Sequence, residues 1–370
     1  LPKLLWLKEH EPHTWASAHR FLLYEDLIVQ KMTGQPAISH CLASRTQLYD
    51  LRAGRWSPEI LALLELDERR LAPVVPSGTP VGKMRPTVAE SLGLREPPLV
   101  VTGGHDQACG ALGVGLTRPG LAMVSTGTAE VVEVALDSPA LNDTLYRANI
   151  SCYAHVVPGL YLAMTLNHSG GLLLRWFRDT FCQEEQRTAL ETGRDAYDLI
   201  LSGASSDPSP LLVLPHFAGS GTPTFDTTSK GAILGLTFAT RKTDVAKAIL
   251  EGLTFELRLN LELLKVGGIV IDELRAIGGG ARSPLWLQLK ADITGIPVVA
   301  PRVPQAACWG AALLAGMGAG CLLHVAQAAE ESVVLERRFE PDPQRSTAFD
   351  ARYHLYRRVY PAVAPICHEL

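Results

Sequence analysis

Asp106 is the residue of this 370-residue chain that is best placed for acid–base chemistry. It follows a short apolar stretch that predicts a strand and precedes a run of small residues that predicts a helix. A carboxylate at such a junction can act as general base toward a substrate hydroxyl. An ordinary carboxylate is basic enough for phosphoryl transfer, because the attacking alcohol loses its proton late. The alternative is that Asp106 only caps the following helix.

Three consecutive glycines, Gly278 to Gly280, form a second candidate site. They lie between an apolar stretch and a helical pattern, with Ser283 predicted as the N-cap of that helix and Pro284 as its first residue. A strand–glycine–helix turn of this kind exposes bare backbone and a helix N-terminus. It suits a nucleotide, because only glycine lets the backbone approach the ligand closely. A tight turn without a ligand is the alternative.

The turn Ser125–Thr128 is a third candidate, since its hydroxyl and backbone N–H groups can cradle phosphate oxygens. Many hairpins contain the same Thr-Gly pair, so the turn alone is not diagnostic. The loop 219–226 is open to the same two interpretations, a phosphate cradle or a turn in which Asp226 simply bonds its own backbone. Asp292 is expected to form a structural ion pair or hydrogen bond. Neither a Walker A motif nor a GxSxG elbow occurs in the sequence.

The helices and strands that position these residues alternate along the chain, as the spacing of apolar residues indicates. Helices are predicted over residues 4–8, 20–32, 58–66, 107–115, 171–181, 243–264, 304–320 and 346–360. Strands are predicted over residues 99–102, 121–124, 130–136, 147–157, 160–165, 211–215 and 334–340. This alternation indicates an α/β protein, and the length indicates two domains.

Composition narrows the class of protein. A net charge of −4 with 19% charged residues gives no electrostatic reason to expect nucleic acid as a partner. No apolar run is long enough to cross a membrane, so no membrane partner is expected. The seven cysteines include no CxxC pair, which argues against a metal or disulfide framework and favours a cytoplasmic location.

Several of these signals occur in the order found in one known family. The segment 231–251 resembles the C-terminal signature of the FGGY carbohydrate kinases. The glycine triplet with Ala281 and residues 291–295 resembles the adenosine motif of that family, and residues 310–315 are similar to its next helix. Residues 33–34, 49–51 and 56–57 resemble its N-terminal domain. The resemblance is to xylulokinase-like members and covers nearly the whole chain.

The resemblance implies an α/β fold of two actin/sugar-kinase/Hsp70-like (ribonuclease H-like) domains with an interdomain cleft. Residues 1–121 would be the remainder of the N-terminal sugar-binding domain, and residues 122–370 the C-terminal ATP-binding domain. The family begins with a hairpin that bears a DxGT-type phosphate loop, and no such motif occurs within residues 1–60. The N-terminal domain is therefore expected to be incomplete, and this polypeptide alone is expected to have little activity.

The same resemblance assigns roles to particular residues. Asp106 would be the general base, with His105 and Gln107 as substrate contacts. The residues implied at the nucleotide are Gly127, Thr128, Gly235, Gly279, Gly280 and Ala281. The reaction would transfer the γ-phosphoryl group of ATP to a primary hydroxyl of a ketose or polyol. Mg²⁺ would bridge the phosphates, with no protein ligand assigned to it. Family members often pair, so a homodimer is one expected assembly.

Two other functions remain open at this point. A nucleotide-binding regulatory protein or degenerate kinase without sugar chemistry is favoured by the absence of the DxGT motif and disfavoured by Asp106. An NAD-dependent oxidoreductase would require a GxGxxG turn between strand and helix. Gly110, Gly113 and Gly115 have the wrong order for that turn and lie within a predicted helix. The sequence does not identify the sugar.

Overall fold

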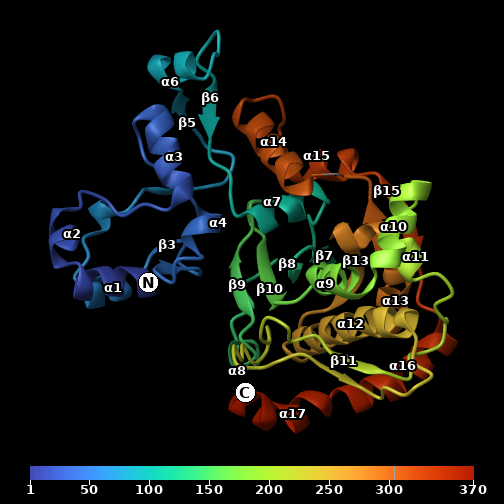
Figure 1. Ribbon diagram of the computed structural model, residues 1–370. Helices are drawn as coiled ribbons and strands as arrows, with labels where there is room; N and C mark the ends of the chain where they lie inside the picture. Colours follow the sequence, from blue (N-terminus) through green and yellow to red (C-terminus); the bar gives the residue numbers. More distant parts are fainter. Residues whose placement is uncertain (304) are drawn as a thin grey trace.

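The computed structural model describes residues 1–303 and 305–370 and divides into a smaller N-terminal part and a larger C-terminal part (Figure 1). The N-terminal helices are α1 (Pro2–His10), α2 (Pro12–Ser17), α3 (Tyr24–Thr33), α4 (His40–Ala43), α5 (Pro58–Leu64) and α6 (Pro86–Ser91). Its strands are β1 (Ile38–Ser39), β2 (Tyr49–Asp50), β3 (Arg55–Trp56), β4 (Val74–Val75), β5 (Pro80–Lys83) and β6 (Leu99–Val101). These strands pair only two by two, as β1–β4, β2–β3 and β5–β6.

The C-terminal part is built on a seven-stranded sheet with the order β15-β14-β13-β7-β8-β10-β9. Its strands are β7 (Gly120–Thr126), β8 (Glu130–Leu136), β9 (Ser151–Ala154), β10 (Tyr161–Asn167), β13 (Ile271–Gly278), β14 (Val298–Pro301) and β15 (Leu335–Phe339). β7, β8 and β10 form an antiparallel meander, and β13 and β14 continue the sheet parallel to β7. This is the ribonuclease H-like arrangement implied by the resemblance.

Helices cover both faces of this sheet (Figure 1). The helices of the C-terminal part are α7 (Asp106–Gly113), α8 (Asp143–Arg147), α9 (Gly171–Phe181), α10 (Gln183–Thr192), α11 (Ala196–Ile200), α12 (Lys242–Val266), α13 (Pro284–Thr294), α14 (Ala306–Gly318), α15 (Val325–Ser332), α16 (Pro343–Tyr356) and α17 (Val359–Glu369). α12 and α13 pack on one face, and α7, α14 and α15 on the other. A separate pair, β11 (Leu212–Leu214) and β12 (Ala232–Leu234), lies beside α12.

Small residues allow α7 and α14 to pack closely. A Cβ at Gly113 would lie 2.0 Å from the carbonyl oxygen of Ala306, and one at Gly310 would lie 1.9 Å from that of Cys109. Both substitutions would therefore push the two helix backbones apart. The helix predicted over 107–115 is thus observed as α7, and its small residues let it pack closely on α14. Pro304, the first residue of the predicted helix 304–320, lies outside the described residues.

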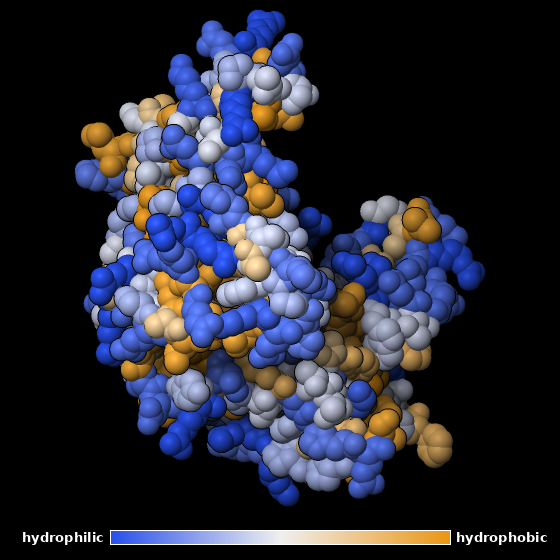
Figure 2. Space-filling view, turned by 90° about the vertical axis from the view of Figure 1, so that its left-hand side faces the viewer, coloured by the Kyte–Doolittle hydropathy of each residue, from blue (hydrophilic) through white to orange (hydrophobic). Residues whose placement is uncertain are grey.

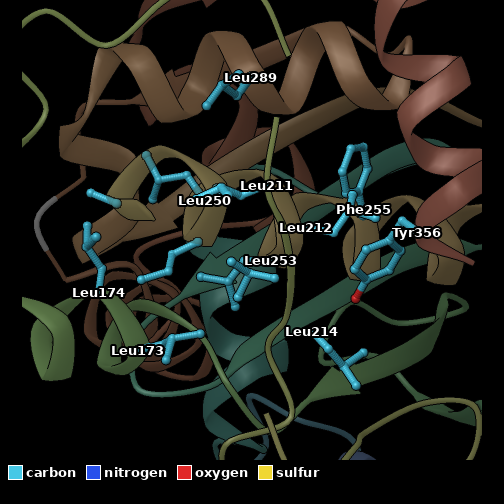
Figure 3. Packing of buried hydrophobic residues seen from close by; sticks show 14 of the residues in the cluster. Leu173, Leu174, Leu211, Leu212, Leu214, Leu250, Leu253, Phe255, Leu289 and Tyr356 are labelled. Carbon is cyan, nitrogen blue, oxygen red and sulfur yellow. The ribbon is translucent and has the colours of Figure 1, made fainter. Parts of the chain in front are cut away.

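A further hydrophobic cluster supports α12 on its outer side (Figure 3). Figure 3 shows Leu173 and Leu174 from α9 on one side of the cluster and Phe255 from α12 beside Tyr356 on the other. Leu211, next to β11, and Leu289 belong to the same cluster. Burying an aliphatic or aromatic side chain of this size contributes about 1.5–3 kcal/mol. The cluster thereby fixes the positions of α9, α12 and α13 relative to one another.

Several predicted elements differ from those observed; the helix predicted over 20–32, for example, begins only at Tyr24. The strand predicted over 147–157 begins only at Ser151, because Asn142 caps α8: its side chain accepts a hydrogen bond from the Leu145 amide at 3.0 Å. The helix predicted over 346–360 is two helices, α16 and α17. Pro361 has no amide hydrogen to continue α16, but it is tolerated in the first turn of a new helix.

The surface is mostly hydrophilic on the side shown in Figure 2, with scattered apolar patches and a deep hollow between an upper lobe and a projection on the right. Among the described residues, no helix is both long enough and apolar enough to cross a membrane. All seven cysteines are free thiols.

Candidate active site

One candidate site is a cavity of about 720 Å³ beside the carboxyl ends of β7 and β13. Its volume lies in the range of about 300–1,000 Å³ that is usual for small-molecule sites. Four residues predicted at the nucleotide line this one cavity: Gly127, Thr128, Gly279 and Gly280. The remaining lining residues are Thr126, Gly171, Leu174, Arg175, Arg178, Asp195, Tyr197, Asp198, Leu201, Leu250, Arg282, Ser283 and Trp286.

Strand pairing brings the two glycine turns together. β7 and β13 are parallel neighbours, and Thr126 is the register partner of Gly278. A Cβ at Gly278 would lie 2.5 Å from the carbonyl oxygen of Thr126, and the residue has φ +83. Both the close approach and the left-handed backbone therefore require glycine at this position. The adjoining turn is held by α9, where the Gly171 amide donates to the carbonyl of Gly127 at 2.7 Å.

The helix after the glycines begins as predicted. Ser283 is the N-cap of α13, its hydroxyl accepting a hydrogen bond from the Trp286 amide at 3.3 Å, and Pro284 is the first helical residue. Ser283 and Trp286 also line the cavity, so the N-terminus of α13 borders it. The unpaired N–H groups at a helix start carry partial positive charge and favour anionic ligands.

Charged side chains complete the lining. Arg175, Arg178 and Arg282 supply positive charge, and Asp195 and Asp198 supply carboxylates. Guanidinium groups match the geometry of phosphate oxygens. No backbone or side-chain atom would lie within 4 Å of a Cβ at Gly127, so this backbone is open to a ligand. Exposed glycine backbone, cationic side chains and the cavity volume together fit a nucleotide polyphosphate.

Two residues predicted at the nucleotide do not line the cavity. Gly235 follows β12 with φ +92, and a Cβ there would lie 3.0 Å from the carbonyl oxygen of Pro210. Ala281 follows Gly280 but packs toward the sheet, and its carbonyl accepts a hydrogen bond from Arg337 at 2.7 Å. Both residues therefore contact the protein framework around the site rather than the cavity itself.

Asp106 is the first residue of α7, and its side chain is 74% exposed. His105, not Asp106, occupies the N-cap position, so the capping interpretation of Asp106 is not supported. The Asp106 carboxylate accepts a hydrogen bond from the Gln107 amide at 2.7 Å. Gln107 is half-buried, and its Oε1 atom has no hydrogen-bond partner among the described residues. An exposed carboxyl group and an unpartnered amide oxygen thus belong to successive residues at the helix start.

His105 is held against the sheet behind Asp106. Its Nδ1 lies 3.4 Å from Oδ1 of Asp106, and its ring meets that of Tyr153 edge-on with centroids 6.0 Å apart. Burial, followed by the charge of Arg45, lowers the pKa of His105 below its ordinary value. The imidazole is therefore neutral near pH 7.

Sequence reasoning missed the polar group beneath His105. The hydroxyl of Tyr153 donates to Oε1 of Glu133 at 2.7 Å, and both side chains are buried. Burial outweighs this hydrogen bond and raises the pKa of Glu133 to about 8. Arg45 lies over the Tyr153 ring, 4.6 Å from its centroid. A carboxylate inside the apolar pattern of the predicted strand 130–136 was the signal available in the sequence.

A second buried polar group, also missed, lies under the cavity. Lys290 and Glu130 form an ion pair in which each side chain is 1% exposed. The Thr126 hydroxyl donates to Glu130 at 2.7 Å and accepts from Lys290 at 3.1 Å. Asp292, two residues farther along α13, is structural as expected: it accepts from the Asp342 amide at 2.9 Å and pairs with Arg345. Asp226 accepts hydrogen bonds from the backbone amides of Thr228 and Ser229, which agrees with the second interpretation of its loop.

Comparison with known proteins finds relatives along nearly the whole chain. A xylulose kinase from Bacillus subtilis is 31% identical over 360 residues, covering 97% of this chain and 70% of the relative. An autoinducer-2 kinase from Enterobacter sp. is 32% identical over 373 residues, covering 97% of this chain and 68% of the relative. The crystal structure of a xyloylose kinase from Brucella ovis matches with a TM-score of 0.86 at 27% identity, over 99% of this chain and 73% of that one.

Family models agree with these relatives. Residues 1–113 match the N-terminal domain of the FGGY family of carbohydrate kinases, and residues 122–319 match its C-terminal domain. The second match alone spans more than half of the chain, and its range contains every residue that lines the cavity. The chain therefore belongs to the FGGY family of carbohydrate kinases, enzymes that phosphorylate a sugar hydroxyl with ATP.

Proposed function

We propose that this kinase transfers the γ-phosphoryl group of ATP to a primary hydroxyl of a ketose or polyol. The observation that carries the proposal is the convergence of Gly127, Thr128, Gly279 and Gly280 on one cavity. Two of the relatives are called xylulose kinase and autoinducer-2 kinase, which supports a small polyhydroxylated acceptor without selecting one. In this proposal, residues 1–121 supply the sugar side of the cleft and residues 122–370 the ATP side.

The nucleotide phosphates would bind at the turn that contains Gly127 and Thr128, where backbone N–H groups and Arg175 are available. Gly279 and Gly280 would contact the adenosine. Gly235 and Ala281 would support these turns through the framework contacts described above. The arginines would offset the phosphate charge, and the apolar residues Leu174 and Leu250 would pack against the base.

Asp106 would accept the proton of the attacking hydroxyl. Its exposed side chain can reach a substrate, and it lies beside the neutral imidazole of His105. The unpartnered Oε1 of Gln107 would accept a hydrogen bond from a sugar hydroxyl, as would the imidazole of His105 according to its tautomer. These contacts would orient the acceptor for in-line attack.

Mg²⁺ would neutralise charge on the phosphates as they transfer. Among the described residues, no group of three or more His, Cys, Asp or Glu side chains could hold a metal ion by itself. The cavity still fits Mg²⁺, because proteins usually hold this ion through substrate phosphates and one or two carboxylates. Pairing into a homodimer and a cytoplasmic location, which the free thiols support, remain part of the proposal.

An ADP-release assay across a panel of ketoses and polyols tests the proposal, with ADP binding measured in parallel. We expect ADP to bind and at least one sugar to stimulate ADP release, with the stimulation lost in Asp106→Asn. Long incubations and a high enzyme concentration make a low rate measurable. Sugar-independent ADP release that Asp106→Asn does not change would contradict the proposal and favour nucleotide chemistry without a sugar.

A further inference from the structure

We propose that the buried Lys290–Glu130 pair is a positioning device for the phosphate-binding turn, rather than a source of fold stability. Neither residue lines the cavity, and both lie directly beneath residues that do. This inference rests on the proposed ATP site.

The pair joins both ends of the turn to a helix. Thr126 is the last residue of β7 and Glu130 the first residue of β8, so they flank Gly127, Thr128 and the intervening Ala129. The Lys290 ammonium, from α13, contacts Oε2 of Glu130 and lies 3.1 Å from the Thr126 hydroxyl. That hydroxyl donates to the same carboxylate at 2.7 Å. The three side chains form a closed triangle that sets the separation of the strand ends.

Thr126 also sets the position of the second turn. A Cβ at Gly278 would lie 2.5 Å from its carbonyl oxygen, and one at Gly280 would lie 2.8 Å from its Cβ. On the helix side, the Lys290 ammonium lies 5.1 Å from the ring centroid of Trp286, which lines the cavity. A displacement of Thr126 would therefore move the Gly127 turn and the Gly278–Gly280 turn together.

The pair is poorly suited to a purely stabilising role. Removing two charges from water costs about as much as their attraction returns, and apolar replacements are often neutral or stabilising. The second carboxylate oxygen, Oε1 of Glu130, is buried without a hydrogen-bond partner among the described residues. An unsatisfied buried acceptor adds a further cost. The Lys290–Glu130 pair forms directional hydrogen bonds with Thr126, and an apolar pair could not form them.

The chain contains a matched control in α12. Lys247 and Glu251 form an ion pair that is 3% and 2% exposed, with Glu251 accepting from the Ser209 amide at 3.0 Å. Neither residue lines the cavity or contacts the two glycine turns. Both pairs join a lysine to a glutamate and are nearly equally buried. Only the Lys290–Glu130 pair contacts the phosphate-binding turn.

The test compares Glu130→Leu/Lys290→Met with Lys247→Met/Glu251→Leu. Calorimetric titration measures the Kd for ADP and for adenosine, and thermal unfolding measures Tm. We expect the first variant to raise the Kd for ADP at least about tenfold and the Kd for adenosine by a smaller factor, because ADP loses contacts at both turns and adenosine at only one. The control variant should leave both Kd values within about twofold of wild type. If Glu130→Leu/Lys290→Met does not fold, Glu130→Gln/Lys290→Met keeps the volume and polarity at residue 130.

The outcomes separate the two proposals. Wild-type ADP affinity in the folded Glu130/Lys290 variants, or equal weakening in the control variant, would overturn the positioning role while the ATP site stands. An equal loss of adenosine and ADP affinity would overturn it as well, because the pair would then support the whole cavity. A wild-type protein that binds neither ligand would overturn the ATP site itself.

Discussion

Oδ1 of Asp106 lies 3.4 Å from Nδ1 of His105 at the start of α7, and the His105 ring rests edge-on against Tyr153. Burial lowers the pKa of His105, so its imidazole is neutral near pH 7 and its contact with Asp106 is not an ion pair. This contact links the exposed Asp106 carboxyl group to the buried Tyr153–Glu133 group behind it.

Asp106→Asn should lower kcat for sugar phosphorylation by about 10²–10⁴-fold, because positioned general bases contribute that much. The Kd for ADP should not change, since Asp106 does not line the nucleotide cavity. Steady-state kinetics and titration with ADP measure the two quantities. Asp137→Asn, at an exposed aspartate, is the control and should retain both. If Asp106→Asn loses ADP binding and Asp137→Asn does not, Asp106 does more than accept a proton.

Tyr153→Phe should lower the free energy of unfolding by about 1–3 kcal/mol, because it leaves the buried Oε1 of Glu133 without its donor. Urea denaturation measures the change. Tyr146→Phe is a suitable control, since Tyr146 is 82% exposed. If both variants unfold like the wild type, the Tyr153–Glu133 hydrogen bond has no net effect on stability.

Glu133 should make the protein less stable as the pH rises. Its pKa is raised from 4.5 to about 8, so between these values the folded protein holds a proton that the unfolded chain releases. The resulting stabilisation is complete below about pH 4.5 and is lost as the pH rises toward 8, with a slope of at most about 1.4 kcal/mol per pH unit. Unfolding measured from pH 5 to 8 should show a shallower decline in Glu133→Gln. Parallel curves for the two proteins would contradict the raised pKa.

Gly279→Ala should weaken nucleotide binding and leave Tm unchanged. A Cβ at residue 279 meets only the Thr126 carbonyl oxygen, at 4.0 Å, so the protein accommodates it and the methyl group projects at the cavity wall. Gly280→Ala should lower Tm as well, because its Cβ would lie 2.8 Å from Thr126 and 3.1 Å from Trp286. Titration with ADP and thermal unfolding distinguish the two variants. If the Gly279→Ala protein binds ADP with wild-type affinity, the Gly278–Gly280 turn does not contact the nucleotide.

Arg282→Ala should raise the Kd for ATP by about tenfold and leave that for adenosine nearly unchanged, because a guanidinium hydrogen bond to phosphate is charge-assisted. The difference should shrink at high salt, since Arg282 is exposed to solvent. Arg187→Ala in α10 is the matched control at an exposed arginine outside the cavity. If the two substitutions raise the Kd for ATP equally, Arg282 acts only through the overall surface charge and not through contact with the phosphates.

Local features of the site could be predicted from the sequence because their causes are local. Ser283 and Pro284 start α13 through a cap and a fixed φ, and both were recognisable from residue type alone. The glycine triplet after an apolar stretch likewise predicts a turn after a strand, which is observed. The helix at 143–147 was missed because its only strong local signal is the Asn142 cap, inside a segment with β-like apolar residues.

The sequence by itself determined the α/β class, the two glycine turns and the family, because each depends on short motifs in chain order; Asp106 as general base is a prediction of the same kind. Only the tertiary structure decided which of these residues share a cavity: Gly127 and Gly279 do, whereas Gly235 packs beside Pro210. It also paired Lys290 with Glu130 across 160 residues of sequence. Such pairs follow from strand order and helix packing, which bring distant residues together, and no local periodicity encodes them.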